Sequence, residues 1–323
     1  MKQTKIRWGM IGCGSVTERK SGPAFWQVDA SSLDLVMARR EEQAKDYSER
    51  HGIPQYTTDV AELINHPEID AIYVATPPDS HRDYALMAAK AGKPCVVEKP
   101  MALTTAECDE MIAAFELANV PLFVAYYRRS LPRFKTVSEW VSQGKIGKVR
   151  HIHWTYHRSP NPDDIAGETN WRVNPRQAGG GYFVDLASHG LNLFQQWFGD
   201  ITLAQGIAVN QQGYYEAEDA VSASFAFESG VLGSGYWNFA AATREDRVEI
   251  IGSEGRILCS VFGDEAFVLE GVESLTSLQE NPDPVQYFHV ENLVKHLTGR
   301  ETHPSLGKSA RNTTWAMEQI LSK

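Results

Sequence analysis

The sequence predicts an α/β domain with a parallel sheet, followed by an α+β domain with a mainly antiparallel sheet. The length of 323 residues fits about two domains. Short apolar strands alternate with helices over the first 125 residues, whereas period-two segments separated by short turns dominate after residue 126. We therefore place the domains at 1–125 and 126–323, with the terminal helices free to pack back on the first domain.

Short apolar runs are expected to form the strands of the first domain. They cover residues 6–11, 33–38, 71–75, 95–98 and 121–126. Continuous apolar strands that alternate with helices are typical of a parallel sheet covered on both faces. One helix is expected to begin at Asp79 or Ser80 and to end at Gly92. Thr104 and Glu107 form a capping box that predicts the start of another.

The second domain is expected to begin with a helix at 134–143 and to continue as strands. Period-two alternation, which is typical of half-buried strands, is clear at Val221, Ala223, Phe225 and Phe227. A helical insert at about 181–198 is expected to interrupt the strands. A closing helix is predicted by an i, i+3, i+4, i+7 apolar face that consists of Val290, Leu293, Val294 and Leu297.

Composition excludes several classes of function. A net charge of −10 at pH 7 argues against a protein that binds nucleic acid, which needs clustered Lys and Arg. The sequence has no apolar run long enough to span a membrane, and its first strand starts too early to leave room for a signal peptide. The cysteines form no C-x-x-C pair; they are Cys13, Cys95, Cys108 and Cys259. We therefore expect a cytoplasmic protein without a disulfide framework or a zinc site.

A glycine-rich turn at residues 12–17 follows the first predicted strand and predicts a dinucleotide site. Gly12 permits the tight turn, and Gly14 lacks the Cβ that would keep a pyrophosphate away from the backbone. The amides of the next helix, which begins at Ser15 and Val16, then bind the phosphates. The third glycine of the usual motif is missing, so the turn alone also fits any α/β protein. The strand before it and the βαβ rhythm after it favour the dinucleotide.

The end of the second strand indicates which dinucleotide is bound. An acidic residue at position 38 would accept from the ribose 2′-hydroxyl and favour NAD, but Ala38 stands there. Arg39 and Arg40 can instead clamp a 2′-phosphate. We expect NADP to be preferred, with NAD as the other possible cofactor. The alternative interpretation of the two arginines is a solvated pair at a helix start.

Two further segments carry candidate chemistry. Glu98-Lys99-Pro100 lies at the carboxyl end of a predicted parallel strand, where open α/β sheets bind ligands. Asp185 and His189 are four residues apart and would share one face of a helix. Without other context, Lys99 also fits a surface lysine, and the Asp–His spacing also fits an ordinary helix-face pair.

Together these motifs resemble the glucose–fructose oxidoreductase / inositol dehydrogenase / MocA (Gfo/Idh/MocA) family. The resemblance covers nearly the whole chain in the right order, through Gly12-Cys13-Gly14, Ala75-Thr76-Pro77-Pro78 with His81, Glu98-Lys99-Pro100, Arg128-Arg129 with Pro132, the turn at 144–147, and Gly179-Gly180-Gly181 through Asp185 to His189. It implies a Rossmann domain followed by an open-faced antiparallel sheet. It also implies NAD(P)-dependent oxidation or reduction at a carbinol carbon, usually of a sugar or cyclitol. Thr17 and Ala38 depart from the family pattern, and Ala38 argues against NAD.

The resemblance also implies the residues of the site. His189 is expected to be the acid/base, because an ordinary His pKa of about 6.5 suits proton exchange with a carbinol. Lys99 is expected to polarise the substrate oxygen, and Asp185 to orient the site. The expected cofactor residues are Gly12, Gly14, Ser15, Val16, Arg39, Arg40, Thr76, Pro77, His81, Glu98 and Lys99.

Weaker candidates for a substrate wall are Trp171 and Arg172, because a flat aromatic ring and a guanidinium suit a polyol. They fit equally well as a core tryptophan and a structural ion pair. Tyr126, Arg129 and Tyr156 are weaker still.

Three histidines at alternate positions would share one face of a strand: His151, His153 and His157. That spacing can bind a metal, but the sequence places no carboxylate ligand beside them, so we expect no metal. A polar face of the open sheet is the preferred interpretation. In the resembled family this sheet commonly pairs subunits, which implies a homodimer or homotetramer.

The sequence leaves three functions open. The first is an NADP-preferring dehydrogenase or reductase that acts on a sugar, cyclitol or related polyol. The second is a glycosidase or lyase that uses tightly bound NAD for transient oxidation. The third is a non-catalytic dinucleotide-binding regulator, which the combination of Lys99, Asp185 and His189 argues against because a regulator needs no proton relay.

Overall fold

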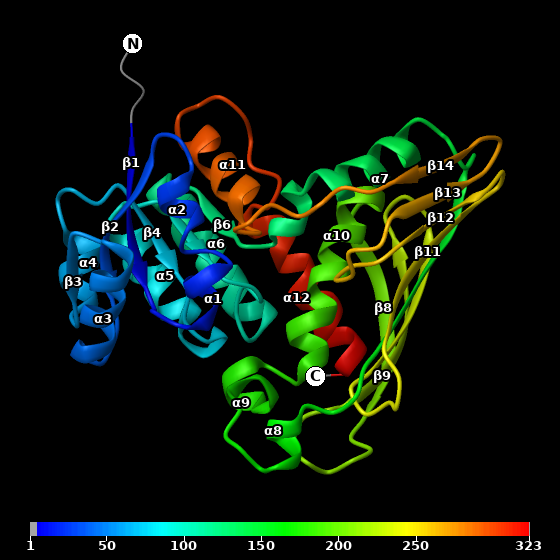
Figure 1. Cartoon of the computed structure of the whole chain (residues 1–323), viewed down its shortest axis with the longest axis horizontal. Coiled ribbons are helices and arrows are strands. Elements are labelled where there is room, and N and C mark those ends of the chain that lie inside the picture. Colours follow the sequence, from blue (N-terminus) through cyan, green and yellow to red (C-terminus); the bar gives the residue numbers. More distant parts are fainter. Residues whose placement is uncertain (1–4, 323) are drawn as a thin grey trace. The chain divides into compact units, whose positions relative to one another are not determined.

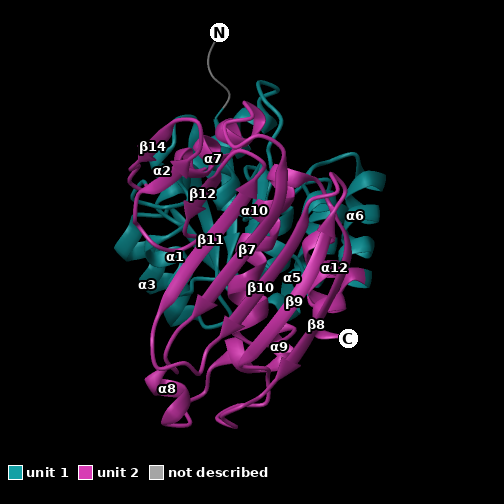
Figure 2. Ribbon diagram, turned by 90° about the vertical axis from the view of Figure 1, so that its right-hand side faces the viewer, with its two compact units in different colours: residues 1–102, 106–130, 282–310 teal, residues 103–105, 131–281, 311–323 magenta. Residues whose placement is uncertain are grey.

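The computed structural model describes residues 5–322, which form two compact units (Figure 2). The first unit comprises residues up to 102, 106–130 and 282–310, and the second comprises 103–105, 131–281 and the residues from 311. The chain therefore leaves the first unit after residue 130 and returns to it at 282. The sequence-based prediction places one boundary near residue 125 and lets the terminal helices pack back on the first domain.

The first unit contains a six-stranded sheet in the order β3-β2-β1-β4-β5-β6, and every strand pair is parallel. Its strands are β1 (Ile6–Ile11), β2 (Ser31–Met37), β3 (Gln55–Thr57), β4 (Ala71–Val74), β5 (Cys95–Val97) and β6 (Leu122–Val124). The predicted Rossmann-type parallel sheet is confirmed. The sequence does not predict β3, because Gln55 and Tyr56 are exposed and form no apolar run.

Alternate residues of β1 pack into two separate hydrophobic clusters. Trp8 and Met10 pack with Phe25 and Tyr73 in one cluster, and Ile11 belongs to the other. This burial on both sides is why the strands of the unit read as continuous apolar runs. The helices of this part of the chain (Figure 1) are α1 (Ser15–Arg19), α2 (Ala24–Gln27), α3 (Glu41–His51), α4 (Val60–Asn65), η1 (Pro78–Ser80), α5 (His81–Lys90), α6 (Thr105–Ala118), η2 (Tyr127–Ser130) and α11 (Tyr287–Leu297).

The apolar face expected for the closing helix lies on α11. Val290, Leu293 and Val294 are buried in the cluster around Trp8, and Leu297 packs against it. This packing ties residues 282–310 to the first unit.

The second unit contains an eight-stranded sheet in the order β14-β13-β12-β11-β7-β10-β9-β8 (Figure 2). Its strands are β7 (Val149–His157), β8 (Ile201–Val209), β9 (Ala220–Phe227), β10 (Leu232–Asn238), β11 (Glu245–Gly252), β12 (Arg256–Cys259), β13 (Phe267–Glu270) and β14 (Ser274–Ser277). The sheet is mainly antiparallel, as predicted. The exception is the parallel pair β7–β10, which forms because a long helical insert separates β7 from the meander of β8, β9 and β10.

Helices cover one face of this second sheet (Figure 1). Trp154 on β7 contacts Phe194 of α10 with ring centroids 5.7 Å apart, and Phe134 of α7 contacts Phe267 of β13 at 5.5 Å. Near the end of the chain, Ile320 of α12 approaches Gly206 of β8. The helices of this part of the chain are α7 (Pro132–Ser142), α8 (Pro162–Ile165), η3 (Trp171–Val173), α9 (Pro175–Ala178), the π-helical η4 (Phe183–Ala187), α10 (Ser188–Phe198) and α12 (Gly307–Leu321). Within residues 5–322, no helix combines the length and hydrophobicity needed to cross a bilayer.

An ion-pair cluster between α1 and α3 predicts a pH-dependent stability. Arg50 donates to both oxygens of Glu18 at 2.8 and 2.9 Å, and His51 lies 2.9 Å from the same carboxylate. The hydrogen bonds from Arg50 are the main cause that lowers the pKa of Glu18 to about 2, against a smaller raising effect of burial. A lowered carboxylate pKa stabilises the folded state above the unfolded pKa of about 4.3, and this contribution is lost as the pH falls toward 2.

We expect Glu18→Gln to lower the thermal unfolding midpoint at pH 7 and to have progressively less effect from pH 5 to pH 2, because the native carboxylate is then protonated as well. Thermal scans at several pH values measure this difference. Glu49→Gln is the control, since Glu49 lies 3.8 Å from Lys45 in a pair that is more than half exposed. A loss of stability in Glu18→Gln that stays constant with pH would contradict the expectation.

Candidate active site

The glycine turn after β1 is shaped by close contact with the neighbouring strand. Gly12 has φ +104°, and a Cβ there would lie 2.9 Å from the carbonyl oxygen of Ala75. A Cβ on Gly14 would meet nothing within 4 Å, so the space above Gly14 is open to a ligand. Helix α1 begins at Ser15 with no side chain capping its first amides. The Thr17 hydroxyl, at the third motif position, donates to the Gly14 carbonyl at 2.8 Å.

Arg39 and Arg40, the two arginines expected to bind the 2′-phosphate on the ribose, follow β2 and are exposed. Arg40 donates to the amide oxygen of Gln43 at 3.3 Å, and Gln43 donates to the carbonyl of Cys13 at 2.6 Å. Gln43 thus links the arginine pair to the glycine turn, because it stands in the first turn of α3. The sequence gives no signal for this link. Ala38 is buried at the strand end.

His81 joins two turns at the carboxyl edge of the sheet. Its ring is fully buried, with Nε2 2.8 Å from the carbonyl oxygen of Thr76 and Nδ1 3.0 Å from that of Pro100. Burial is the largest influence and lowers the pKa of His81, while the hydrogen bonds to these carbonyls oppose it. Thr76 accepts from the Ser80 hydroxyl at 2.8 Å. Both ring nitrogens therefore face the backbone of the turns that carry Thr76-Pro77 and Lys99.

Glu98 is a buried carboxylate with three donors. Oε1 accepts from the Tyr73 hydroxyl at 2.7 Å and from Gln286 at 2.8 Å, and Oε2 accepts from the backbone N–H of Lys99 at 3.2 Å. Burial, followed by the charge of Glu98, raises the pKa of Tyr73 well above its ordinary value, so its proton stays available to donate. The network fixes the backbone at Lys99. Tyr73 and Gln286 are members of this network that the sequence does not single out, because one lies inside a strand and the other far along the chain.

These residues of the first unit fit a dinucleotide. The open space at Gly14 and the uncapped start of α1 suit phosphate oxygens, and Arg39 and Arg40 supply exposed positive charge after β2. The turns that hold Thr76 and Lys99 follow β4 and β5 on the same edge of the sheet. This arrangement can hold an extended anion along the edge.

In the second unit, Asp185 and His189 lie on one continuous helical run, but not on a regular α-helix. Asp185 stands in the π-helical segment η4, whereas His189 stands in α10. The expected i, i+4 face is therefore modified by a π turn, and such turns recur at functional sites. The His189 side chain is almost fully buried, and its ring meets the edge of Phe262 with centroids 5.7 Å apart.

A cavity of about 380 Å³ in the second unit brings Trp171, Arg172 and Asp185 together. The Nε of Arg172 lies 3.6 Å from the carboxylate of Asp185, and its guanidinium lies 4.5 Å above the Trp171 ring. Arg158 and Tyr182 line the same cavity. Trp171 and Arg172, two of the candidates for a substrate wall, thus line one concavity, and Arg158, directly after β7, and Tyr182 are members that the sequence does not reveal.

Tyr156 is buried beside Phe262, with ring centroids 5.3 Å apart. Burial is the main cause that raises the pKa of Tyr156. Tyr126 and Arg129 are buried in the first unit, where Arg129 donates to the carbonyl of Pro304 at 3.0 Å. Of the three weaker candidates, only Tyr156 shares the unit of His189.

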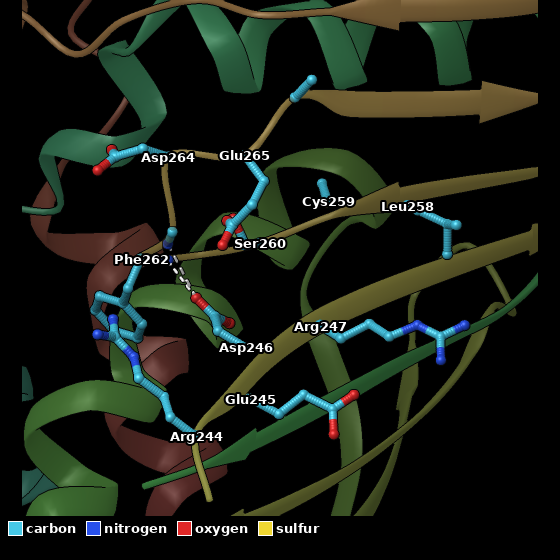
Figure 3. A pocket seen from close by; sticks show the side chains of 12 residues that line it. Arg244, Glu245, Asp246, Arg247, Leu258, Cys259, Ser260, Phe262, Asp264 and Glu265 are labelled. Atoms are coloured by element: carbon cyan, nitrogen blue, oxygen red, sulfur yellow. Dashed lines mark hydrogen bonds between the residues drawn. The ribbon is translucent and has the colours of Figure 1, made fainter.

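A second cavity, of about 810 Å³, lies at the ends of β11 and β12 and the loop that follows (Figure 3). Asp246 accepts there from Trp154 Nε1 at 2.9 Å and from the backbone N–H groups of Phe262 at 2.5 Å and Gly263 at 3.3 Å (Figure 3). These bonds hold the loop that presents Phe262 to His189. No residue of this cavity is singled out by the sequence, because the loop carries no motif.

The alternating histidines of β7 face away from the helices. His151 and His153 both bond the Ser234 hydroxyl, at 3.0 and 2.8 Å, and His157 bonds that of Thr243 at 3.0 Å. Within residues 5–322, no group of three or more His, Cys, Asp or Glu side chains is placed to hold a metal ion. These histidines form hydrogen-bonded rows across the sheet.

Two family models match the chain. Residues 6–126 match a model described as an oxidoreductase family with an NAD-binding Rossmann fold, and residues 134–258 match the GFO/IDH/MocA C-terminal domain. Among relatives, Oxidoreductase P35 of Formosa agariphila is 36% identical, with 98% of each chain covered. A 1,5-anhydro-D-fructose reductase of Ensifer adhaerens is 28% identical, with 78% of this chain and 75% of the relative covered.

Solved structures share the same fold. The aldose-aldose oxidoreductase from Caulobacter crescentus, complexed with glycerol, has a TM-score of 0.86 at 25% identity, with 97% of this chain and 96% of that chain covered. A levoglucosan dehydrogenase in complex with NADH and levoglucosan has a TM-score of 0.86 at 21% identity, with 98% and 96% covered.

Substitutions at the two glycines of the turn should affect cofactor binding and thermal stability differently. We expect Gly14→Val to weaken NADPH binding at least about tenfold without lowering the thermal midpoint, because the new side chain fills space open to the ligand. Gly12→Ala should lower both, because of its positive φ and the nearby Ala75 carbonyl. Fluorescence titration and thermal scans measure the two quantities. Unchanged NADPH affinity in Gly14→Val would refute a phosphate cradle at this turn.

Proposed function

Because the chain belongs to the GFO/IDH/MocA oxidoreductase family, we propose that it transfers hydride between NADP, in preference to NAD, and a carbinol or carbonyl carbon of a sugar, cyclitol or related polyol. The observation that carries the proposal is the open glycine turn on the same sheet edge as Lys99. Relatives named for 1,5-anhydro-D-fructose, myo-inositol and levoglucosan support the substrate class.

The bound nicotinamide ring supplies the carbon that gives or takes hydride. Lys99, at the end of β5, donates to the substrate oxygen and stabilises the negative charge that develops there. Glu98 holds the Lys99 backbone and is itself held by Tyr73 and Gln286, so the turn from which the Lys99 side chain extends is fixed. The rigid turn limits the reorganisation needed during the reaction.

His189 takes the carbinol proton in oxidation and returns it in reduction. Asp185 positions the site through its pairing with Arg172 in the cavity. Lys99 belongs to the first unit and His189 to the second, and we propose a role in hydride transfer for each of them.

The preference for NADP rests on Ala38, Arg39 and Arg40 after β2. No acidic side chain stands at the strand end, and both guanidiniums are exposed. Gln43 restrains Arg40 beside the turn. Guanidinium groups suit bidentate contact with a 2′-phosphate.

We expect the double variant Arg39→Gln/Arg40→Gln to raise the KM for NADP by about 10- to 100-fold while changing that for NAD less than about threefold, because only NADP carries the 2′-phosphate. Absorbance of the reduced cofactor measures both. Arg150→Gln, an exposed arginine of β7, is the matched control. Equal or better turnover of the unchanged enzyme with NAD would refute the preference.

Replacing the proposed reacting groups should lower kcat with cofactor still bound. We expect a loss of about 10²–10³ in Lys99→Met, which removes the donor to the oxygen, and of about 10²–10⁴ in His189→Ala, which removes the acid/base. His189→Ala should also flatten the pH profile of kcat. Stopped-flow and steady-state assays across sugars, inositols and short ketones measure these changes. Near-normal turnover in either variant would exclude its role.

If none of these sugars, inositols and ketones changes the absorbance of the cofactor, and NAD co-purifies with the protein, transient oxidation without net cofactor turnover would be supported instead.

The compartment we propose is the cytoplasm, which the four buried cysteine thiols favour.

We also propose that the bare face of the second sheet pairs subunits into a dimer or tetramer. Exposed apolar side chains stand on it, with Leu203 at 61% and Ile207 at 73% exposure on β8 and Leu232 and Tyr236 on β10. In the strand register, Ile207, Ser222 and Tyr236 lie in one row. We expect Ile207→Glu to shift the protein to monomers in sedimentation velocity, because a carboxylate would be buried at the interface. A Leu117→Glu control, on a 91% exposed residue of α6, should not. A monomeric parent protein would refute the pairing.

A further inference from the structure

We infer that the substrate of this oxidoreductase carries an anionic group, a carboxylate or a phosphate, that Arg158 and Arg244 bind beside His189. The inference rests on the proposed hydride transfer and narrows its substrate to sugar acids or sugar phosphates. Two guanidiniums of the second unit, those of Arg158 and Arg244, carry the inference, because within the described residues neither forms an ion pair with a carboxylate.

Arg158 is held by aromatic rings and lacks a counter-charge. Its guanidinium lies 4.5 Å above the ring of Tyr182 and 5.8 Å from that of Phe239, and it lines the 380 Å³ cavity with Asp185. Its Nε is buried and has no hydrogen-bond partner. Across residues 5–322, no carboxylate lies within ion-pairing distance of Arg158. A stacked guanidinium keeps its in-plane N–H groups free for a bidentate anion.

Arg244 carries a second positive charge, at the 810 Å³ cavity. It is exposed and lines the larger cavity together with Phe262 (Figure 3). In the described part of the chain it too has no ion-pair partner. Burial is the main cause that raises the pKa of Tyr156; the charges of Arg158 and Arg244 lower it, and those of Asp246 and Asp185 raise it. The ring of Phe239 connects Arg158 to Tyr156, because it lies 5.8 Å from the guanidinium and 6.0 Å from the tyrosine ring.

Two ring contacts lead from Tyr156 to His189, the proposed acid/base. Tyr156 contacts Phe262 with centroids 5.3 Å apart, and Phe262 contacts His189 at 5.7 Å. The rings of Tyr156 and Phe262 thus connect this region to His189 through successive contacts.

Most acidic residues of this region have polar partners of their own. In the larger cavity Asp264 lies 3.7 Å from Arg133 and Glu265 accepts from the Ser260 hydroxyl, whereas Glu245 is exposed to water. Asp185 pairs with Arg172, and Asp246 accepts three N–H groups. Asp164 is buried and accepts from Tyr182 at 2.6 Å and from Asn170 at 2.8 Å. Asp163 and Glu168 also line the smaller cavity, but both are exposed to water. A neutral polyol would leave the partly desolvated Arg158 without a counter-charge, which is unfavourable.

The test compares matched neutral and acidic sugars. D-glucuronate and D-galacturonate are set against D-glucose and D-galactose, and glucose 6-phosphate distinguishes a phosphate from a carboxylate. We expect one acidic class to exceed its neutral counterpart at least tenfold in kcat/KM. Arg158→Met should lower kcat/KM for that class about 30-fold or more, mainly through KM, and should lower kcat/KM for neutral sugars much less.

Two further variants keep the test decisive. Arg244→Gln changes an exposed side chain, so it should fold normally and still lose about tenfold on the acidic class alone. Arg150→Met, on the same strand as Tyr156 but exposed, should change nothing. Equal turnover of neutral and acidic sugars, or an equal loss on both in Arg158→Met and Arg244→Gln, would overturn the inference.

Calorimetry separates this inference from the proposed function. Titration of glucuronate or glucose 6-phosphate into the cofactor-loaded protein reports anion binding even where no hydride moves. Binding that Arg158→Met abolishes, without turnover, would support the anion site and count against hydride transfer to that sugar. Absence of binding at millimolar concentrations of either anion would overturn the inference.

Discussion

The parallel pairing of β1 with β2 on one side and with β4 on the other is the constraint on which the first unit depends. Parallel strands end at the same edge, so the turns after β1, β2, β4 and β5 gather there without any long-range motif. The close approach of β1 to β4 requires a residue without Cβ at Gly12, which would otherwise meet the Ala75 carbonyl. The same edge then offers an open cradle at Gly14 and, two strands along, the turn of Lys99.

Buried polar groups make that edge rigid. Glu98 would be costly as an unpaired charge, but it has donors from Tyr73, Gln286 and the Lys99 backbone. His81 spans the carbonyls of Thr76 and Pro100, and so couples the turn after β4 to the turn after β5. The backbone of Lys99, the residue proposed to react, is therefore held by groups that do not themselves need to touch substrate.

Packing in the second unit holds His189, the proposed acid/base. A Cβ on Gly190 would collide with the Trp154 ring, so glycine lets α10 lie directly on the sheet. The residue before it, His189, is thereby held against Phe262, and the Phe262 backbone is anchored by Asp246. The π-helical turn at Asp185 then aims its carboxylate at Arg172 in the cavity, although the chain continues as a regular helix.

The sequence by itself determined the class of fold and the principal motifs, because these depend on local periodicity and on residues adjacent in the chain. The parallel strands, the glycine turn and the apolar face of α11 follow from such patterns. Strand β3 was not predicted because it is short and exposed. The parallel β7–β10 pair was not predicted because it joins segments that are distant in the sequence. Gln43, Tyr73, Gln286, Arg158 and Phe262 carry no local signal. Only the tertiary structure brought each of them beside the candidate residues of its own unit, since hydrogen bonding, ring stacking and the loss of water from a buried charge depend on neighbours in space.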